Sequence, residues 1–486
     1  MSRHNGEPLD LLRMKEYPPS MSMDGFTKRR LMLGFLTNWV GKLSATVIQF
    51  IQIPVFLHFW SVPLYGEWMI VNSIPAYLSF SNAGFGSVAG NEMTMMVARD
   101  DRDGALRVFQ SCWWLISLIC TAIIILLSGT LYYLPAARLL KLTALGESDT
   151  KWIIFYLGIS VLLGQLEQLL QSAYRCIGRY SYGTFLKNLF SLAAFGAMIA
   201  SVALGMGPRM AALIFASINI AVTVFFCILV RRDIPWIEYG WQHASFDEIR
   251  KLFRPAIAFM GFPLGNALSL QGSLLAVGYA LGPTQVVIFS TARTVSRVAL
   301  QMVQMVNNTF EPEMSLAYGA GNYPLTRTLL RRACQLALIA AVIIVLVMMS
   351  FGPWFLTHWT SGHVPPSRNL LSILLLVVVL YALWSTSATL MTSTNQHQRL
   401  ATVYIAGTSL TCVLCYLLAR TYGLYGAAAS LLISETVMNL YVVPACLRIA
   451  HDTMPAFLAS LLHYPHSLRP AALLARIRRS KPGFES

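Results

Sequence analysis

The segment TQVVIFSTARTVSRVALQMVQMVNNTFE, residues 284–311, decides the fold of this chain. It is apolar except for one polar line, whose members follow at spacings of 4, 4, 3, 4 and 3 residues on one helical face: Arg293, Arg297, Gln301, Gln304, Asn308 and Glu311. At about 1.5 Å of rise per residue, the two arginines lie roughly 15–20 Å from the outer end, near the middle of a bilayer. A cation at that depth costs several kcal/mol unless it faces protein, water or a ligand. The segment therefore predicts a membrane bundle that admits an anion.

The composition is that of a membrane protein. Hydrophobic residues make up 56% of the 486 residues and charged residues only 12%, about half their usual share in soluble domains. Twelve apolar runs have about the length that crosses a bilayer: 31–57, 67–92, 108–134, 152–174, 184–206, 210–230, 255–277, 284–311, 333–357, 369–393, 400–419 and 425–447. They predict an all-α polytopic membrane protein with about 12 transmembrane helices. The basic residues that give the net charge of +15 lie mainly in short loops and tails between the apolar runs, which is the positive-inside pattern of membrane proteins. Nucleic acid is therefore not the expected partner.

One longer internal loop divides the spans into two groups of six. An even number of spans in each half means that both halves enter from the same side, as in parallel repeats. The predicted organisation is a cytoplasmic tail at 1–30, an N-terminal six-helix lobe at 31–230, a cytoplasmic linker at 231–254, a C-terminal six-helix lobe at 255–447 and a basic, amphipathic tail at 448–486. The excess of Lys and Arg on the linker side predicts that both termini are cytoplasmic.

Other predicted spans carry polar stripes with helical spacing. The members are Asn38, Lys42, Thr46 and Gln49 in the first span, Glu167, Gln171 and Arg175 at the fourth, Asn266, Ser269 and Ser273 in the seventh, and Glu435 and Asn439 in the twelfth. Stripes on helices of both halves are expected when an aqueous cavity separates two bundles. The alternative is that these side chains hydrogen-bond neighbouring helices to one another.

The charges in the middle of the spans leave two interpretations open. The cations are Lys42, Arg293 and Arg297, and the anions are Glu167 and Glu435. The cavity is therefore cationic unless these ions pair with one another as a gate or as a structural brace. A glutamate in a low dielectric can also take up a proton or bind Na⁺, so Glu167 and Glu435 are candidates for ion coupling or gating.

No enzyme motif is readable in the chain. A Walker nucleotide motif, an HExxH zinc motif and a Ser/His/Asp set do not occur in the sequence. Cys412 and Cys415 lie inside an apolar span, so we expect inert thiols rather than a redox or metal site. The prediction is a chain with no catalytic residue, no metal and no cofactor apart from a coupling H⁺ or Na⁺.

The order of short motifs along the chain resembles one family of membrane proteins. The motifs are Pro54, Tyr65-Gly66-Glu67-Trp68, Gly84-Phe85-Gly86, Asn91-Glu92-Met93, Tyr174-Arg175-Cys176-Ile177-Gly178-Arg179-Tyr180, Leu281-Gly282, Phe289, Ala292-Arg293, Pro312 and Tyr422-Gly423-Leu424-Tyr425-Gly426-Ala427-Ala428. Together they extend over nearly the whole chain. In these motifs the chain is similar to the polysaccharide-transporter (Wzx-type flippase) branch of the MATE-like multidrug/oligosaccharidyl-lipid/polysaccharide exporter (MOP) superfamily.

The resemblance implies a V-shaped bundle of two six-helix lobes that works by alternating access. It implies flipping of undecaprenyl-diphosphate-linked oligosaccharide across the bacterial inner membrane for O-antigen, capsule or exopolysaccharide synthesis, beside polysaccharide polymerase and glycosyltransferases. Arg293, Arg297 and Lys42 then fit as counter-charges of the diphosphate. The polar residues expected to line the cavity are Asn38, Gln49, Gln171, Gln301, Gln304 and Asn308.

Three other functions stay open at the level of the sequence. A cation-coupled multidrug exporter of the same fold would favour acidic groups in its cavity, whereas cations outnumber acids here. A non-transporting membrane scaffold for glycosyltransferases would leave the intramembrane charges without a purpose. A membrane-embedded polymerase would need a larger outer loop than any in this sequence.

Overall fold

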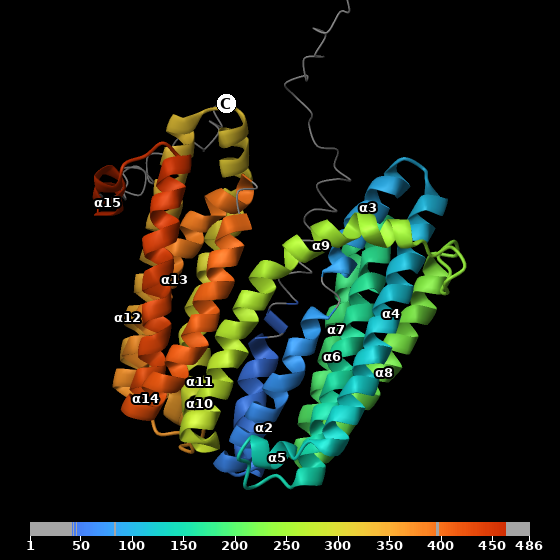
Figure 1. Cartoon of the computed structure of the whole chain (residues 1–486). Coiled ribbons are helices and arrows are strands. Elements are labelled where there is room, and N and C mark those ends of the chain that lie inside the picture. Colours follow the sequence, from blue (N-terminus) through green and yellow to red (C-terminus); the bar gives the residue numbers. More distant parts are fainter. Residues whose placement is uncertain (1–40, 42, 45, 82–83, 395–397, 463–486) are drawn as a thin grey trace, which may run out of the picture.

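The computed structural model describes residues 41, 43–44, 46–81, 84–394 and 398–462. Over these ranges the chain forms helices joined by turns and short loops, and no strand occurs among them. The helices gather in two lobes that meet at one end of the molecule and part at the other, which gives the V shape in Figure 1. The predicted all-α, two-lobed architecture is therefore confirmed. The predicted tail at 1–30 and the end of the tail at 448–486 lie outside the described residues.

The lobes follow one another along the chain. The first contains the helix Thr46–Phe59, α2 (Val62–Ala76), the 3-10 turn η1 (Tyr77–Phe80), α3 (Phe85–Ala98), α4 (Arg102–Tyr133), α5 (Ala136–Leu139), α6 (Glu147–Cys176), α7 (Tyr180–Ala203) and α8 (Pro208–Asp233). The second contains the π-helical turn η2 (Leu268–Gly272), α10 (Ser273–Leu281), α11 (Pro283–Gly319), α12 (Tyr323–Trp359), α13 (Arg368–Ser393), α14 (Gln398–Ile449) and α15 (Met454–Leu462). Between them, α9 (Phe246–Ala267) packs on α3 and α4 as well as on α14. Because α9 contacts both lobes, the limits of the lobes at 230 and 255 stay predictions.

The number of long apolar helices differs from the number of predicted spans. Among the described residues, eight helices are long and apolar enough to do so, against twelve predicted spans. One of them, α14, contains two predicted spans. Gly423, at φ 60° and ψ −145°, interrupts the helix between these two spans. The second span is broken between α2 and α3, where Gly84 adopts the left-handed conformation, and the seventh runs from α9 into α10 through the π-helical turn η2. Part of the first span lies outside the described residues.

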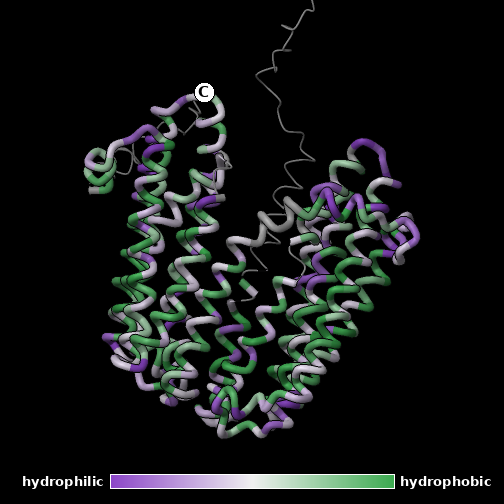
Figure 2. Tube along the Cα trace, in the orientation of Figure 1, coloured by the Kyte–Doolittle hydropathy of each residue, from purple (hydrophilic) through white to green (hydrophobic). Residues whose placement is uncertain are grey.

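Large apolar side chains are exposed on the helices of both lobes, and green segments run along these helices in Figure 2. Ile125 and Leu126 on α4 are 68% and 70% exposed. Rows of large exposed apolar side chains are unfavourable in water but match the hydrocarbon of a bilayer. The long helices therefore form a multi-pass membrane protein whose outer surface contacts lipid.

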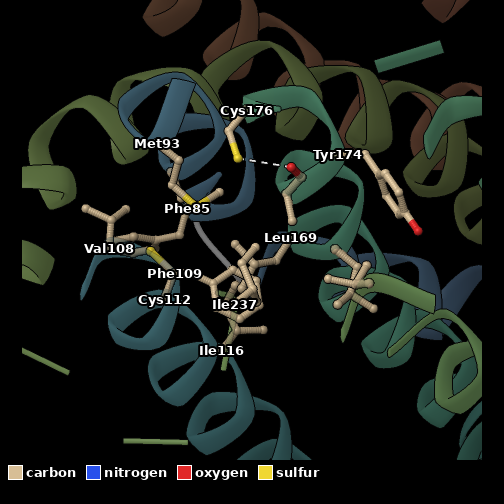
Figure 3. Close-up of a cluster of buried hydrophobic side chains, with 14 of the residues drawn as sticks. Phe85, Met93, Val108, Phe109, Cys112, Ile116, Leu169, Tyr174, Cys176 and Ile237 are labelled. Carbon is tan, nitrogen blue, oxygen red and sulfur yellow. Dashed lines mark hydrogen bonds between the residues drawn. The ribbon is translucent and has the colours of Figure 1, made fainter. Parts of the chain in front are cut away.

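The core of the first lobe packs α3, α4 and α6 around large buried side chains (Figure 3). Phe85, Phe109 and Leu169 are each at most 2% exposed. At the edge of this cluster, the Tyr174 hydroxyl donates a hydrogen bond of 2.8 Å to the carboxylate of Asp233 at the end of α8. The polar group of the buried tyrosine is thus satisfied, and α6 is tied to α8.

A buried carboxylate anchors the loop between α5 and α6 where the lobes meet. Glu67 on α2 is fully buried and accepts hydrogen bonds of 2.6–2.8 Å from the three backbone N–H groups of residues 143–145. The Thr143 hydroxyl donates to the same carboxylate at 3.0 Å. The loop also reaches the second lobe, where Lys141 Nζ lies 4.0 Å from the ring centre of Tyr279 on α10. Glu67 therefore holds a loop that contacts both lobes.

The lobes touch most closely between α2 and the start of α11. A Cβ atom added at Gly66 would lie 2.1 Å from the backbone carbonyl oxygen of Pro283, far inside van der Waals contact. Only glycine permits this approach of two helices from different lobes.

Gly66→Ala is expected to force the two lobes apart at this end, because the carbonyl of Pro283 is backbone and cannot turn aside. Cross-linking of Lys141→Cys to Tyr279→Cys with a short bifunctional thiol reagent measures the distance across the junction, and its yield should fall at least severalfold. Gly164→Ala is the matched control, since a Cβ there meets nothing within 4 Å. Equal yields in the two variants would show that this close approach does not set the distance between the lobes.

Candidate functional site

Two adjoining cavities share one wall, the face of α11 that carries Arg293 and Arg297. The large cavity has a volume of about 610 Å³ and lies mainly among α11, α13 and α14. Its charged and aromatic lining consists of Arg293, Arg297, Glu435, Phe50, Tyr381, Trp384 and Tyr404. The small cavity has a volume of about 220 Å³ and lies between the lobes. Its lining includes Gln52, Tyr65, Trp68, Asn72, Gln271 and Ser290 besides the two arginines.

Arg293 is held by the π-helical turn η2 between α9 and α10. Its guanidinium donates hydrogen bonds to Ser273 Oγ at 2.6 Å, to the carbonyl oxygen of Ser269 at 3.0 Å and to that of Leu270 at 3.4 Å. A π-helical turn such as η2 disturbs the regular helical ladder and leaves backbone carbonyls in need of donors. Arg293 therefore braces this turn, and most of its hydrogen-bonding capacity is already used.

Arg297 lies one helical turn further along α11 and has no such brace. Within the described ranges it forms neither a hydrogen bond nor an ion pair. It lines both cavities, within electrostatic range of Tyr381 and Tyr404, whose neutral hydroxyls do not offset a full charge. A partly buried cation without a counter-charge is costly, and an entering anion would relieve that cost.

Glu435 faces the large cavity without pairing with either arginine. Its Oε2 atom accepts a hydrogen bond from Trp384 Nε1. Arg293 lies within electrostatic range of this carboxylate, yet no ion pair within 4.0 Å joins them among the residues the structure describes. The alternative of arginine–glutamate pairs is therefore not realised in this conformation. Two cations and one anion line the described wall, so its net charge is +1.

Glu167 and Gln171 lie in the first lobe, and neither lines the two cavities. Glu167 accepts a hydrogen bond of 2.8 Å from Thr223 Oγ1, and Gln171 donates one of 2.9 Å to Thr184 Oγ1. Lys187 on α7 is within electrostatic range of Glu167. Against the sequence prediction, Gln171 connects α6 to α7 and does not line the cavity, because the fourth helix presents this side chain to its neighbour.

Three of the predicted lining residues do line the large cavity: Gln49, Gln301 and Gln304. Gln49 donates a hydrogen bond of 3.4 Å to Thr294 on α11, and Gln301 donates one of 3.0 Å to Thr46 on the first helix. Gln49 and Gln301 thus line the cavity and also hydrogen-bond the first helix to α11.

The remaining predicted residues lie elsewhere. Asn308 is exposed and lines neither cavity, whereas Asn307 lines the large one and its buried Oδ1 atom has no hydrogen-bond partner. Asn308 follows Arg293 by fifteen residues along the helix. At about 100° per residue, its side chain points about 60° away from the direction of Arg293, so the later residues of the polar line turn away from the cavity wall. Lys42 and Asn38, predicted as a phosphate counter-charge and a lining residue, lie outside the described residues.

Sequence reasoning missed the aromatic wall of the large cavity and one intramembrane cation. Tyr381, Trp384 and Tyr404 gave no signal, because aromatic residues at helical spacing fill ordinary cores as well. Lys187 stands within the predicted span 184–206, and a complete count of charges inside the spans would have found it.

Solved structures match the chain over most of its length. No protein-family model matches it, and no curated protein does. An inward-facing multidrug resistance MATE family transporter of the MOP superfamily has a TM-score of 0.66 at 15% identity, over 84% of this chain and 99% of that one. The chain has the fold of the MATE transporters. The predicted MATE-like fold is therefore confirmed, while the Wzx-type branch stays a prediction.

Two further solved structures match the chain over most of its length. The outward-facing form of a multidrug resistance MATE family transporter has a TM-score of 0.58 at 15% identity, over 90% of this chain and 95% of that one. A MOP superfamily transporter from Pyrococcus furiosus, described as having a binding pocket of reverse polarity that suggests a different function, has a TM-score of 0.56 at 14% identity, over 87% and 95%. The MATE-like chain thus scores higher with the inward-facing form than with the outward-facing one.

Proposed function

We propose that this MATE-like chain is a flippase for an oligosaccharide linked to a lipid through a diphosphate. The observation that carries the proposal is Arg297, a cation without a counter-charge among the described residues, at the wall of a cavity of about 610 Å³. A diphosphate presents several oxygen atoms to a planar guanidinium. Its entry would offset the cost of leaving Arg297 unpaired, while Arg293 adds charge and keeps η2 in place.

The substrate is proposed to be an undecaprenyl-diphosphate-linked oligosaccharide used for O-antigen, capsule or exopolysaccharide synthesis. Amide and hydroxyl groups around both cavities suit the sugar head. The lipid tail would remain in the bilayer beside the apolar outer faces of the lobes. Polysaccharide polymerase and glycosyltransferases are the proposed partners in the same membrane.

The open end of the V is proposed to face the cytoplasm from the bacterial inner membrane. Arg231 and Arg232 end α8 at this side, and Arg331 and Arg332 lie near the start of α12. Clusters of basic residues favour the cytoplasmic side. The described conformation would then be inward-facing, in line with the higher score of the inward-facing MATE structure.

Coupling to an ion gradient is proposed for Glu435, with Glu167 as the second candidate. A proton on Glu435 would raise the net charge of the described wall of the large cavity by one and so favour diphosphate. Loss of that proton would weaken the binding again. The carboxylate thus offers a physical link between H⁺ and an anionic substrate.

A multidrug exporter is the second candidate function, because MATE family multidrug transporters share this fold. The charge of the large cavity argues against it, since two cations and one anion repel a cationic drug. The transporter from Pyrococcus furiosus, described with a pocket of reverse polarity, gives a precedent within the superfamily for a pocket that differs in this respect.

Deletion of the gene is expected to abolish surface polymer and to trap lipid-linked oligosaccharide in the inner leaflet. The measurement is extraction of undecaprenyl-linked oligosaccharides together with an assay of the leaflet that holds them. The wild-type gene should restore the polymer. Normal polymer combined with increased sensitivity to cationic drugs would reject the flippase and favour the exporter.

A further inference from the structure

The small cavity has the chemistry of a carbohydrate site. We infer that it binds the one sugar unit attached directly to the diphosphate, and that this unit is a neutral pyranose. The inference rests on the proposed function, because it takes the diphosphate to lie at Arg297. Both arginines line both cavities, so a phosphate held there brings its attached sugar to the mouth of the small cavity.

Four polar side chains converge on the small cavity without a hydrogen-bond partner in the described part of the chain. They are Gln52 on the first helix, Asn72 on α2, Gln271 in η2 and Ser290 on α11. Each amide carries an acceptor oxygen and two donor hydrogens, which is the complement of neighbouring sugar hydroxyls. In contrast, Gln49 and Thr294 on the same wall already bond to each other. The unused donors and acceptors therefore mark the part of the wall that is available to a ligand.

Two aromatic side chains line the same cavity. Trp68 and Tyr65 line the cavity and are only 2% and 3% exposed. Phe56 and Trp60 pack against Trp68, with ring centres at 6.0 Å and 5.4 Å. The part of these rings that lines the cavity can contact the slightly positive C–H groups of a pyranose ring, whose hydroxyls would then reach the amides.

Size and charge limit the ligand further. A volume of about 220 Å³ has room for roughly seven water molecules at about 30 Å³ each, which suits one pyranose and not a chain of sugars. Apart from the shared arginines, the lining holds no charged side chain within the described ranges. The rest of the oligosaccharide would have to lie in the large cavity.

The test uses the purified full-length protein in nanodiscs and three lipid probes. They are undecaprenyl diphosphate, the same lipid carrying one neutral hexose or N-acetylhexosamine from a small panel, and the lipid carrying one uronic acid. At least one neutral sugar is expected to tighten binding about tenfold over the bare diphosphate, and the uronic acid is expected to give no such gain. The double variant Gln52→Leu/Asn72→Leu should remove the gain while keeping the affinity for undecaprenyl diphosphate, which also shows that the variant is folded.

Two controls separate the ways in which the inference can fail. Gln285→Leu on α11 lies outside both linings and should behave like the wild type, and Ser290→Ala gives a milder change should the double variant not fold. Binding of undecaprenyl diphosphate with no gain from any neutral sugar would overturn the sugar site and leave the proposed function intact. No binding of any probe would overturn both.

Discussion

Arg297→Ala is expected to abolish surface polymer without unfolding the protein. The substitution removes a cation that no described residue balances, so the folded state loses no hydrogen bond in this part of the chain. Substrate binding, by contrast, loses a charge-assisted contact, and such losses amount to about 2–5 kcal/mol, roughly thirtyfold to several thousandfold in affinity. Polymer on the cell surface, binding of undecaprenyl diphosphate and thermal stability of the purified protein are the three measurements.

Arg293→Ala provides the matched comparison on the same helix, one turn away. The Ser273 hydroxyl and two carbonyls of η2 would lose the hydrogen bonds from the guanidinium, although the Ser273 hydroxyl would still donate to both carbonyls. Each lost hydrogen bond to a charged group costs about 1.5–3 kcal/mol. Arg293→Ala is therefore expected to lower the melting temperature clearly, whereas Arg297→Ala leaves it unchanged or raises it. Wild-type transport by Arg297→Ala, or equal melting temperatures of the two variants, would show that the arginines do not divide these roles.

Glu67→Ala is expected to lower the free energy of unfolding by about 3–5 kcal/mol. The carboxylate is fully buried and accepts hydrogen bonds from the backbone N–H groups of residues 143–145 and from the Thr143 hydroxyl. Alanine would leave these donors without an acceptor and release the loop that reaches Tyr279. Denaturant or thermal unfolding in detergent measures the loss.

Glu238→Ala is the control for a carboxylate that contributes little. Its ion pair with Arg231 is 3.2 Å long, and both side chains are 48% exposed, so its loss should cost less than about 1 kcal/mol. A similar loss of stability in both variants would mean that the buried position of Glu67 is not what makes it important.

Most of the fold could be predicted from the sequence because the bilayer imposes length and polarity on every span. The π-helical turn η2 and the break at Gly84 could not, since hydropathy averages over a window and does not register a local change of helical geometry. Gly423 was visible as part of a motif, but its part in separating two spans depends on its backbone angles.

The candidate site was predicted in outline and not in detail. Helical spacing put Arg293 and Arg297 on one face, yet it could not show that one braces a π-helical turn and the other is unpaired, because the acceptors come from a different helix. For the same reason, Gln171 could not be distinguished from a lining residue, and the aromatic side chains at Tyr381 and Trp384 could not be assigned to the cavity.

The walls of the small cavity come from both lobes, with Trp68 and Asn72 on one side and Gln271 and Ser290 on the other. If the junction at Gly66 separates so that the outer end opens, the two walls separate as well. A sugar held between them would keep its contacts with only one wall, so its affinity would fall at the moment when the exit opens. When a binding site is divided between two moving bodies, release is thus a geometric result of opening.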